Sequence, residues 1–91
     1  MESIIGKWKT GIDGHNIYEF NDNGTFRNYS NDTEFKLTGQ YSVKKRLLRN
    51  HLLTISVPNI STNTLTFSVY GNILKLYPND GGNPIVFERT H

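Results

Sequence analysis

The sequence predicts an all-β domain that folds as an antiparallel up-and-down barrel of eight strands. Alanine, the strongest helix former, is absent from the 91 residues, while β-branched and aromatic residues are plentiful. Several runs alternate apolar and polar residues with a period of two, which is typical of strands with one solvated face. Turn signals separate these runs, and a sheet built from hairpins has exposed edges unless it closes into a barrel.

The alternation predicts strands at residues 4–11, 15–20, 25–31, 34–43, 51–57, 64–70, 73–77 and 85–90. The clearest run is "EFKLTGQYSV", in which one face carries Phe35, Leu37, Gly39, Tyr41 and Val43. A slip of one residue would bury the polar face, so the register of this strand is well specified. "NDNG" at 21–24 and "YGN" at 70–72 predict tight hairpin turns, because asparagine and glycine accept positive φ.

The segment "VKKRLLRNHLL" interrupts the alternation. We expect a short helical turn or a loop near residues 44–50, with Leu47 and Leu48 packed under one end of the barrel. The alternative is that the two flanking strands extend through this segment as one long hairpin.

Composition limits the class of protein. The length predicts a single domain over residues 1–91, and the absence of cysteine excludes disulfides and thiolate metal sites. No run approaches the ~20 apolar residues of a membrane span. The formal net charge of +2 is small for a nucleic-acid-binding protein, so we do not expect that partner. A cytoplasmic location is the default expectation, and a secreted one applies if a leader has been removed.

The predicted interior contains enough large side chains to fill a small barrel without a ligand. Alternation points the following residues inward: Trp8, Tyr18, Phe20, Phe26, Phe35, Leu37, Tyr41, Val43, Leu53, Ile55, Val57, Leu65, Phe67, Val69, Leu74, Leu76 and Phe87. A filled core is therefore favoured over a ligand cavity, although barrels of eight strands occur in both forms. If a cavity exists, we expect it to be apolar, open at the end away from Trp8, and lined by Tyr18, Phe20, Phe35, Tyr41 and Phe67. The two tyrosines would be hydrogen-bond handles for a ligand, or their hydroxyls would reach solvent or backbone at the rim.

The stretch "GKWK" contains Gly6-Lys7-Trp8, which resembles the G-x-W signature of the first strand in the lipocalin and fatty-acid-binding superfamily. The later segments "YEFNDNGTFR", "GQYSV", "FSVYGNILKLY" and "FER" follow in the order seen in small microbial lipocalin-like domains. The resemblance implies a barrel closed at one end by Trp8, with Arg89 packed across its ring, and it implies a carrier of a small hydrophobic ligand. The basic segment and the short length depart from the family pattern.

The sequence offers no arrangement of residues typical of catalysis. His15, His51 and His91 are far apart in the sequence, and a zinc site needs three or four ligands. The carboxylates are scattered, and no serine lies in the context of an activated nucleophile. We therefore predict no catalytic residue, no metal and no cofactor, and a protein that is not an enzyme.

Two surface features remain as candidates for binding. The first is a basic cluster of Lys44, Lys45, Arg46 and Arg49, which could engage a membrane surface, an acidic protein partner or nucleic acid, although a solvated turn is favoured. The second is a set of apolar residues that alternation points outward, namely Ile17, Leu52, Tyr70, Ile73, Tyr77 and Val86. Tyr70, Ile73 and Tyr77 would form a patch if they were adjacent across their hairpin. The leading hypothesis is a protein-interaction module or homodimer that uses one of these surfaces, and the alternative is a carrier of a small hydrophobic molecule.

Overall fold

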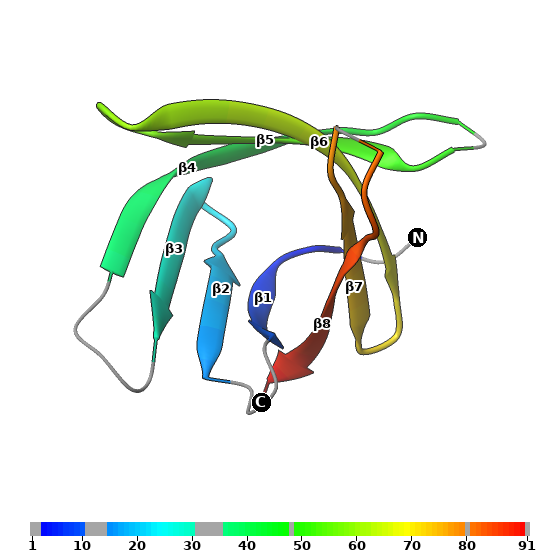
Figure 1. Cartoon of the computed structure of the whole chain (residues 1–91), viewed down its shortest axis with the longest axis horizontal. Coiled ribbons are helices and arrows are strands. Elements are labelled where there is room, and N and C mark those ends of the chain that lie inside the picture. Colours follow the sequence, from blue (N-terminus) through cyan, green and yellow to red (C-terminus); the bar gives the residue numbers. More distant parts are fainter. Residues whose placement is uncertain (1–2, 11–14, 31–35, 48, 80, 91) are drawn as a thin grey trace.

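Eight antiparallel strands close into a barrel in which each strand pairs with its neighbours in the sequence and the last pairs with the first (Figure 1). A computed structural model describes residues 3–10, 15–30, 36–47, 49–79 and 81–90. The strands are β1 Gly6–Thr10, β2 Asn16–Phe20, β3 Thr25–Ser30, β4 Lys36–Lys44, β5 His51–Val57, β6 Ser61–Tyr70, β7 Ile73–Tyr77 and β8 Ile85–Thr90. The predicted all-β, up-and-down barrel of eight strands is confirmed.

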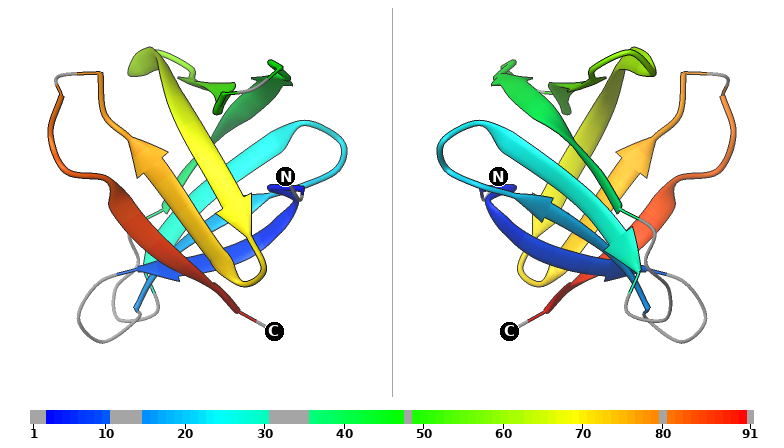
Figure 2. Two further views of the ribbon diagram at one scale, coloured as in Figure 1. Left: turned by 90° about the vertical axis from the view of Figure 1, so that its right-hand side faces the viewer. Right: turned by 90° about the vertical axis from the view of Figure 1, so that its left-hand side faces the viewer.

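Closure of the barrel depends on the pairing of β1 with β8. Trp8 is the register partner of Arg89 on one side and of Tyr18 on the other. β1 and β8 pair antiparallel, and the strands run obliquely across the barrel (Figure 2). Each of the eight described strands has a neighbouring strand on both sides, so the described part of the sheet has no edge strand.

The core follows the predicted alternation. Every residue expected to point inward belongs to the core cluster or packs against it, except Phe35, which lies outside the described residues. Ile4, in the segment before β1, is an additional member that is 4% exposed. The alternation therefore predicted which face of each strand is apolar, and the interior contains Trp8, Phe20, Phe67 and Phe87, each at most 1% exposed.

Of the two forms expected near residues 44–50, a short helical turn or a loop, the structure has the loop, at residues 45–50, and none of its described residues is helical. β4 ends at Lys44 and β5 begins at His51. The backbone N–H of Arg46 donates to His51 Nδ1 at 3.1 Å, and Arg46 Nε donates to the Asn50 carbonyl at 2.8 Å. These two bonds close the loop. Leu47 is 90% exposed, so it does not pack under the barrel, and Leu48 lies outside the described residues.

Strand β4 is shared between two neighbours. Residues 36–40 pair with β3, and residues 40–44 pair with β5. Gly39 lies where β4 passes from one partner to the other, and a Cβ there would meet the backbone of Ser56 and Val57. β6 begins three residues earlier than predicted, at Ser61, because paired hydroxyls of Thr54 with Thr64 and of Ser56 with Thr62 extend the β5–β6 ladder.

The two ends of the barrel differ. The closed end is formed by residues 3–5, the turn at 21–24, the loop at 45–50 and the turn at 71–72, and residues 3–5 bring the chain across it. Among the described residues, those at the open end are the turn at 58–60 and residues 78–79 and 81–84. Figure 1 looks into the open end, and the side views of Figure 2 place the N-terminal segment and the β2–β3 turn at the opposite end.

Candidate functional site

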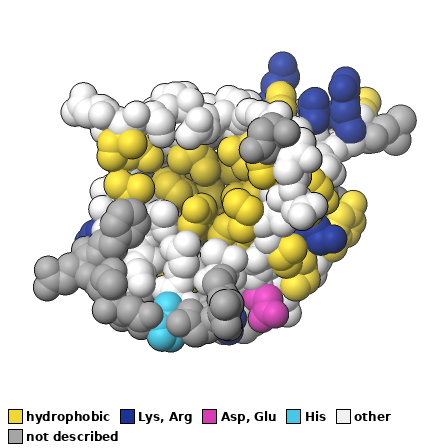
Figure 3. Space-filling view, in the orientation of Figure 1, with side chains coloured by type: hydrophobic (Ala, Val, Ile, Leu, Met, Phe, Trp, Pro, Cys, Tyr) yellow, Lys and Arg dark blue, Asp and Glu magenta, His cyan; other side chains and the backbone are white. Residues whose placement is uncertain are grey.

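The open end of the barrel contains a cavity of about 300 Å³. Figure 3 shows hydrophobic side chains gathered in the centre of this face, inside the ring of strands seen in Figure 1. Most of the wall is apolar, and its members are Tyr18, Phe26, Asn28, Leu37, Ile55, Val57, Ser61, Asn63, Leu65, Leu76, Pro78 and Ile85. The volume lies at the small end of the ~300–1,000 Å³ typical of small-molecule sites.

Asn28 is the polar group in this wall that lacks a protein partner. Its Oδ1 atom is buried and accepts no hydrogen bond. Asn28 pairs with Tyr18 on β2 and with Leu37 on β4, and both of these neighbours line the same cavity. A buried acceptor without a partner costs about 1–3 kcal/mol.

Tyr18 lies beside Asn28 and is held by aromatic contacts. Its ring centroid lies 5.7 Å from that of Phe26 and 4.8 Å from that of Phe87. Burial disfavours the charged phenolate and raises the pKa of Tyr18 above its ordinary value of 10.0. At neutral pH the Tyr18 hydroxyl is therefore protonated and can donate or accept a hydrogen bond.

The described members of the five residues predicted to line a ligand cavity are divided between two sites and the core. Tyr18 lines the open-end cavity, whereas Tyr41 and Phe67 line a separate crevice at the closed end. Phe20 is fully buried in the core, and Phe35 lies outside the described residues. The Tyr41 hydroxyl donates to the Asn21 carbonyl at 2.6 Å, as expected for a tyrosine that reaches backbone at a rim.

Asn28 and Asn63 are cavity residues that the sequence-based prediction missed. Asn28 follows Phe26 by two residues in β3, so alternation places it on the inward face. The sequence did contain a signal for this residue, namely a polar side chain at a position that the alternation places on the apolar face of the strand. Asn63 lies in the part of β6 that the predicted strand did not include.

The residues of the G-x-W resemblance meet at the closed end. The Arg89 guanidinium lies over the Trp8 ring, with Cζ 4.1 Å from the ring centroid. Gly6 has φ +135°, and a Cβ there would lie 2.6 Å from Arg89 Nη1, so the glycine gives the guanidinium its space. Trp8 is fully buried and donates through Nε1 to the Ile4 carbonyl at 2.8 Å. These three residues hold the closed end together.

The three residues of the predicted apolar patch are not contiguous. Tyr70 is 69% exposed and pairs with Ile73 beside the β6–β7 turn. Tyr77 pairs instead with Thr66, and Lys75 lies between Ile73 and Tyr77 on the same face of β7. Ile73 and Tyr77 are half-buried. Of the other residues predicted to point outward, Val86 is 48% exposed and Leu52 is half-buried.

Ile17 does face outward, but it is not exposed: only 5% of its surface is accessible, although it is not a member of the core cluster. Its register partners are Lys9 on β1 and Tyr29 on β3. Long side chains on both flanking strands can cover a residue on the outer face of a sheet. The expectation that Ile17 contributes to an exposed surface is therefore wrong.

The predicted basic cluster lies on the loop that projects at the upper right of Figure 1. Lys44, Lys45 and Arg49 are exposed, whereas Arg46 is half-buried and donates within the loop. The cations surround Leu47, which is almost fully exposed. The projecting loop therefore exposes basic side chains around one apolar side chain. Arg46 differs from the other cations because its hydrogen bonds stabilise the loop itself.

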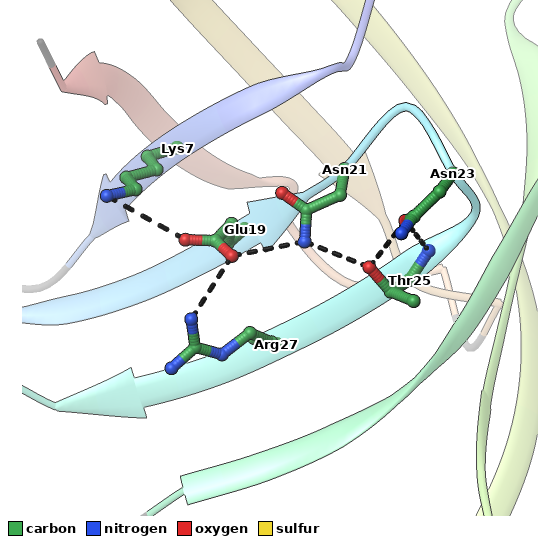
Figure 4. Close-up of polar contacts among 6 residues, drawn as sticks. All are labelled: Lys7, Glu19, Asn21, Asn23, Thr25 and Arg27. Atoms are coloured by element: carbon green, nitrogen blue, oxygen red, sulfur yellow. Dashed lines mark hydrogen bonds and ion pairs between the residues drawn. The ribbon is translucent and has the colours of Figure 1, made fainter.

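A second charged cluster lies on the outer face of β1, β2 and β3, where Glu19 is only 7% exposed (Figure 4). Its carboxylate accepts from Asn21 Nδ2 at 3.1 Å and from Arg27 Nη1 at 3.4 Å, and it lies 3.8 Å from Lys7 Nζ. Asn21 also donates to the Thr25 hydroxyl across the β2–β3 turn. Both carboxylate oxygens of Glu19 are engaged within the cluster, so its role is to hold three strands and their turn in register.

Neither a metal-binding cluster nor a membrane-spanning helix occurs in the described part of the chain. No group of three or more His, Cys, Asp or Glu side chains among these residues could hold a metal ion. No helix among them is long and apolar enough to cross a membrane.

Comparison with known proteins places the chain in a family without assigning an activity. No curated protein and no solved structure matches the sequence. One family model matches residues 2–90, nearly the whole chain, and it is described as a family of unknown function, DUF5640. The chain therefore belongs to the DUF5640 family, and it gives that family an antiparallel barrel of eight strands.

Proposed function

We propose that the protein is a lipocalin-like carrier that binds a small, mainly apolar molecule with one hydrogen-bond donor in the open-end cavity. The observation that carries this proposal is the buried, unpartnered Oδ1 of Asn28 in an otherwise apolar wall. The resemblance of Gly6, Trp8 and Arg89 to the lipocalin signature agrees with it.

The chemistry of the wall defines the ligand class. Aromatic and aliphatic side chains favour a compact hydrophobic body, and the volume of about 300 Å³ limits its size. Asn28 Oδ1 selects a hydroxyl or N–H group, because only a donor relieves the cost of its burial. The ligand is held without a covalent step, so this function is binding and not catalysis.

Phenol and anisole provide a matched pair of probes, since they share an aromatic ring and only phenol has a donor. Titration followed by ¹H–¹⁵N NMR should shift resonances of the open-end wall, with phenol binding about fivefold more tightly, as expected for one hydrogen bond of ~1 kcal/mol. Asn28→Leu should abolish this preference and leave anisole binding in place. Asn72→Leu, in the exposed turn between β6 and β7, is the control and should change neither affinity.

Leu65→Trp should fill the cavity and abolish binding of both probes. Equal affinities for phenol and anisole in the unmodified protein, or shifts confined to other surfaces, would contradict the proposal. Native mass spectrometry of the protein purified from its own host should then reveal a co-purifying small molecule, and this molecule should be displaced by phenol.

A second candidate is interaction with an acidic protein partner through the basic loop. The observation that favours it is Leu47, which is 90% exposed between Lys45 and Arg49 on a projecting loop. A second copy of the chain is a poor occupant, because two such loops would repel each other. Cross-linking in the native host should join one partner to Lys44 or Lys45, and Leu47→Asp combined with Arg49→Glu should remove that partner. A self-cross-link, or a partner unaffected by the double substitution, would refute this candidate.

A further inference from the structure

We propose that a crevice at the closed end is a separate binding site for a small zwitterion, with a free amino acid of apolar side chain as the fitting class. The crevice has a volume of about 410 Å³. It is lined by Asp22, Lys45 and His51 together with apolar groups that include Ile4, Val43 and Phe67. It shares no lining residue with the open-end cavity, so the proposal does not depend on the function proposed above.

Five segments that are distant in the sequence form the crevice. They are residues 3–5, the β2–β3 turn, the end of β4 with Lys45 directly after it, the beginning of β5, and Phe67 of β6. The hydrogen bond from Trp8 Nε1 to Ile4 and those from Arg89 to Ile5 and Ser3 fix the first of these segments. The wall is therefore held in place before a ligand arrives, which reduces the ordering cost of binding.

The crevice contains two side chains of opposite charge that are both available to a ligand. Asp22 and Lys45 both line it, and among the described residues no ion pair joins them. A simple anion would be repelled by Asp22, and a simple cation by Lys45. A molecule that carries an ammonium and a carboxylate group a few bonds apart can satisfy both side chains.

His51 also lines the crevice and is a possible hydrogen-bond donor to a ligand. The Arg46 backbone N–H donates to His51 Nδ1 at 3.1 Å, so Nδ1 is an acceptor and the neutral ring carries its proton on Nε2. The ring packs edge-on against Phe67, with centroids 5.8 Å apart. Lys45 and the Nε2–H group of His51 together suit a carboxylate.

Asp22 is positioned to meet the ammonium group. Asp22 lines the crevice together with Tyr41, and burial first and then the Asp22 charge raise the pKa of the Tyr41 phenol. The Tyr41 hydroxyl donates its hydrogen bond to the Asn21 carbonyl, so that proton is not shared with the Asp22 carboxylate. The apolar part of the wall, formed by Ile4, Val43 and Phe67, then accommodates a hydrophobic side chain.

The experiment compares three probes on the full chain: L-phenylalanine, N-acetyl-L-phenylalanine, which lacks the cation, and L-phenylalaninamide, which lacks the anion. NMR titration should shift resonances of residues 22–24, 41–45 and 51 with phenylalanine. Each derivative should bind at least about fivefold more weakly, the effect of one lost charge contact of ~1 kcal/mol.

Two variants with one matched control complete the test. Lys45→Gln should weaken binding of phenylalanine and of the N-acetyl derivative, whereas Lys44→Gln should leave both unchanged, because Lys44 does not line the crevice. Asp22→Asn should weaken binding of phenylalanine but not of the N-acetyl derivative. Equal affinity for the three probes, no saturable shift at millimolar phenylalanine, or equal effects of the Lys44 and Lys45 substitutions would overturn the proposal.

Discussion

The guanidinium of Arg89 lies 4.1 Å above the ring centroid of Trp8 and at the same time donates to the carbonyls of Ile5, at 2.9 Å, and Ser3, at 3.2 Å. Trp8 donates to the Ile4 carbonyl between them. One residue near the C-terminus and one in the first strand therefore bind the same N-terminal segment. The closed end is a cooperative unit formed by the two ends of the chain.

Replacement of Arg89 by methionine should destabilise the barrel by about 1–3 kcal/mol, because it removes a cation–π contact and two charged hydrogen bonds while keeping an apolar stem. Arg89→Lys should lower the free energy of unfolding by a smaller amount, since a positive charge over the Trp8 ring remains. Urea unfolding followed by Trp8 fluorescence measures the free energy. Arg49→Met on the exposed loop is the control, and an equal loss there would contradict the specific role of Arg89.

Gly6→Ala should destabilise the protein by about 2–4 kcal/mol, through strain at φ +135° and through the clash of the new Cβ with Arg89 Nη1. Gly81→Ala provides the comparison, because Gly81 also has positive φ, +80°, but a Cβ added there would meet nothing within 4 Å. In an Arg89→Ala background the cost of Gly6→Ala should fall. Strict additivity of the two substitutions would show that the contact with Arg89 does not matter.

Most of the fold was predictable because the alternation of side chains follows directly from strand geometry. The residues that alternation places on the inner face of each strand identified the core, and the turn residues identified the order of the hairpins. The pairing of Trp8 with Arg89 was predictable only through the family resemblance. The alternation says which face a side chain occupies, whereas nothing local indicates which residues of the first and last strands meet.

The features that were not predicted depend on contacts between strands and loops, which local sequence patterns do not specify. Ile17 is buried on the outer face because of its lateral neighbours, which depend on the register between strands. Leu47 is exposed because Arg46 closes the loop and directs it away from the barrel. The closed-end crevice joins residues 3–5 to His51 and Asp22, which only the tertiary fold brings together.

Glu19→Ala should cost about 1–3 kcal/mol, because Asn21 and Arg27 both lose their acceptor at a nearly buried position. Lys7 contributes little of this, since it is 57% exposed and lies 3.8 Å away. Glu19→Gln keeps an acceptor oxygen and should lose less. Chemical denaturation measures the change, and amide exchange should rise in the β2–β3 turn. Glu88→Ala, at an exposed position of β8, should change stability by no more than about 0.5 kcal/mol; a similar loss at both glutamates would argue against the cluster.

Gly39→Ala should be more damaging than substitution of a glycine in an open turn. A Cβ at Gly39 would meet the Ser56 carbonyl, and this is backbone that a rotamer change cannot move aside. We expect a loss of at least about 2 kcal/mol, together with weaker amide protection at the β4–β5 pairing. Gly71→Ala is the comparison, since nothing lies within 4 Å there and its cost arises from positive φ alone. Retention of full β4–β5 protection in Gly39→Ala would show that the strands can separate without loss.

Alkaline pH should destabilise the barrel through Tyr18. Burial raises the pKa of Tyr18 above 10.0, so the unfolded chain releases this proton at a lower pH than the folded protein does. The stabilising contribution is complete below about pH 10 and is lost as the pH rises towards the pKa of the folded state. Urea unfolding between about pH 9 and 11 should therefore give a steep decline in the free energy of unfolding, and Tyr18→Phe should make that decline shallower. Tyr70→Phe, at an exposed tyrosine, should leave the slope unchanged. If the unmodified protein and Tyr18→Phe lose stability with the same slope, the Tyr18 phenol is not the group that links folding to alkaline pH.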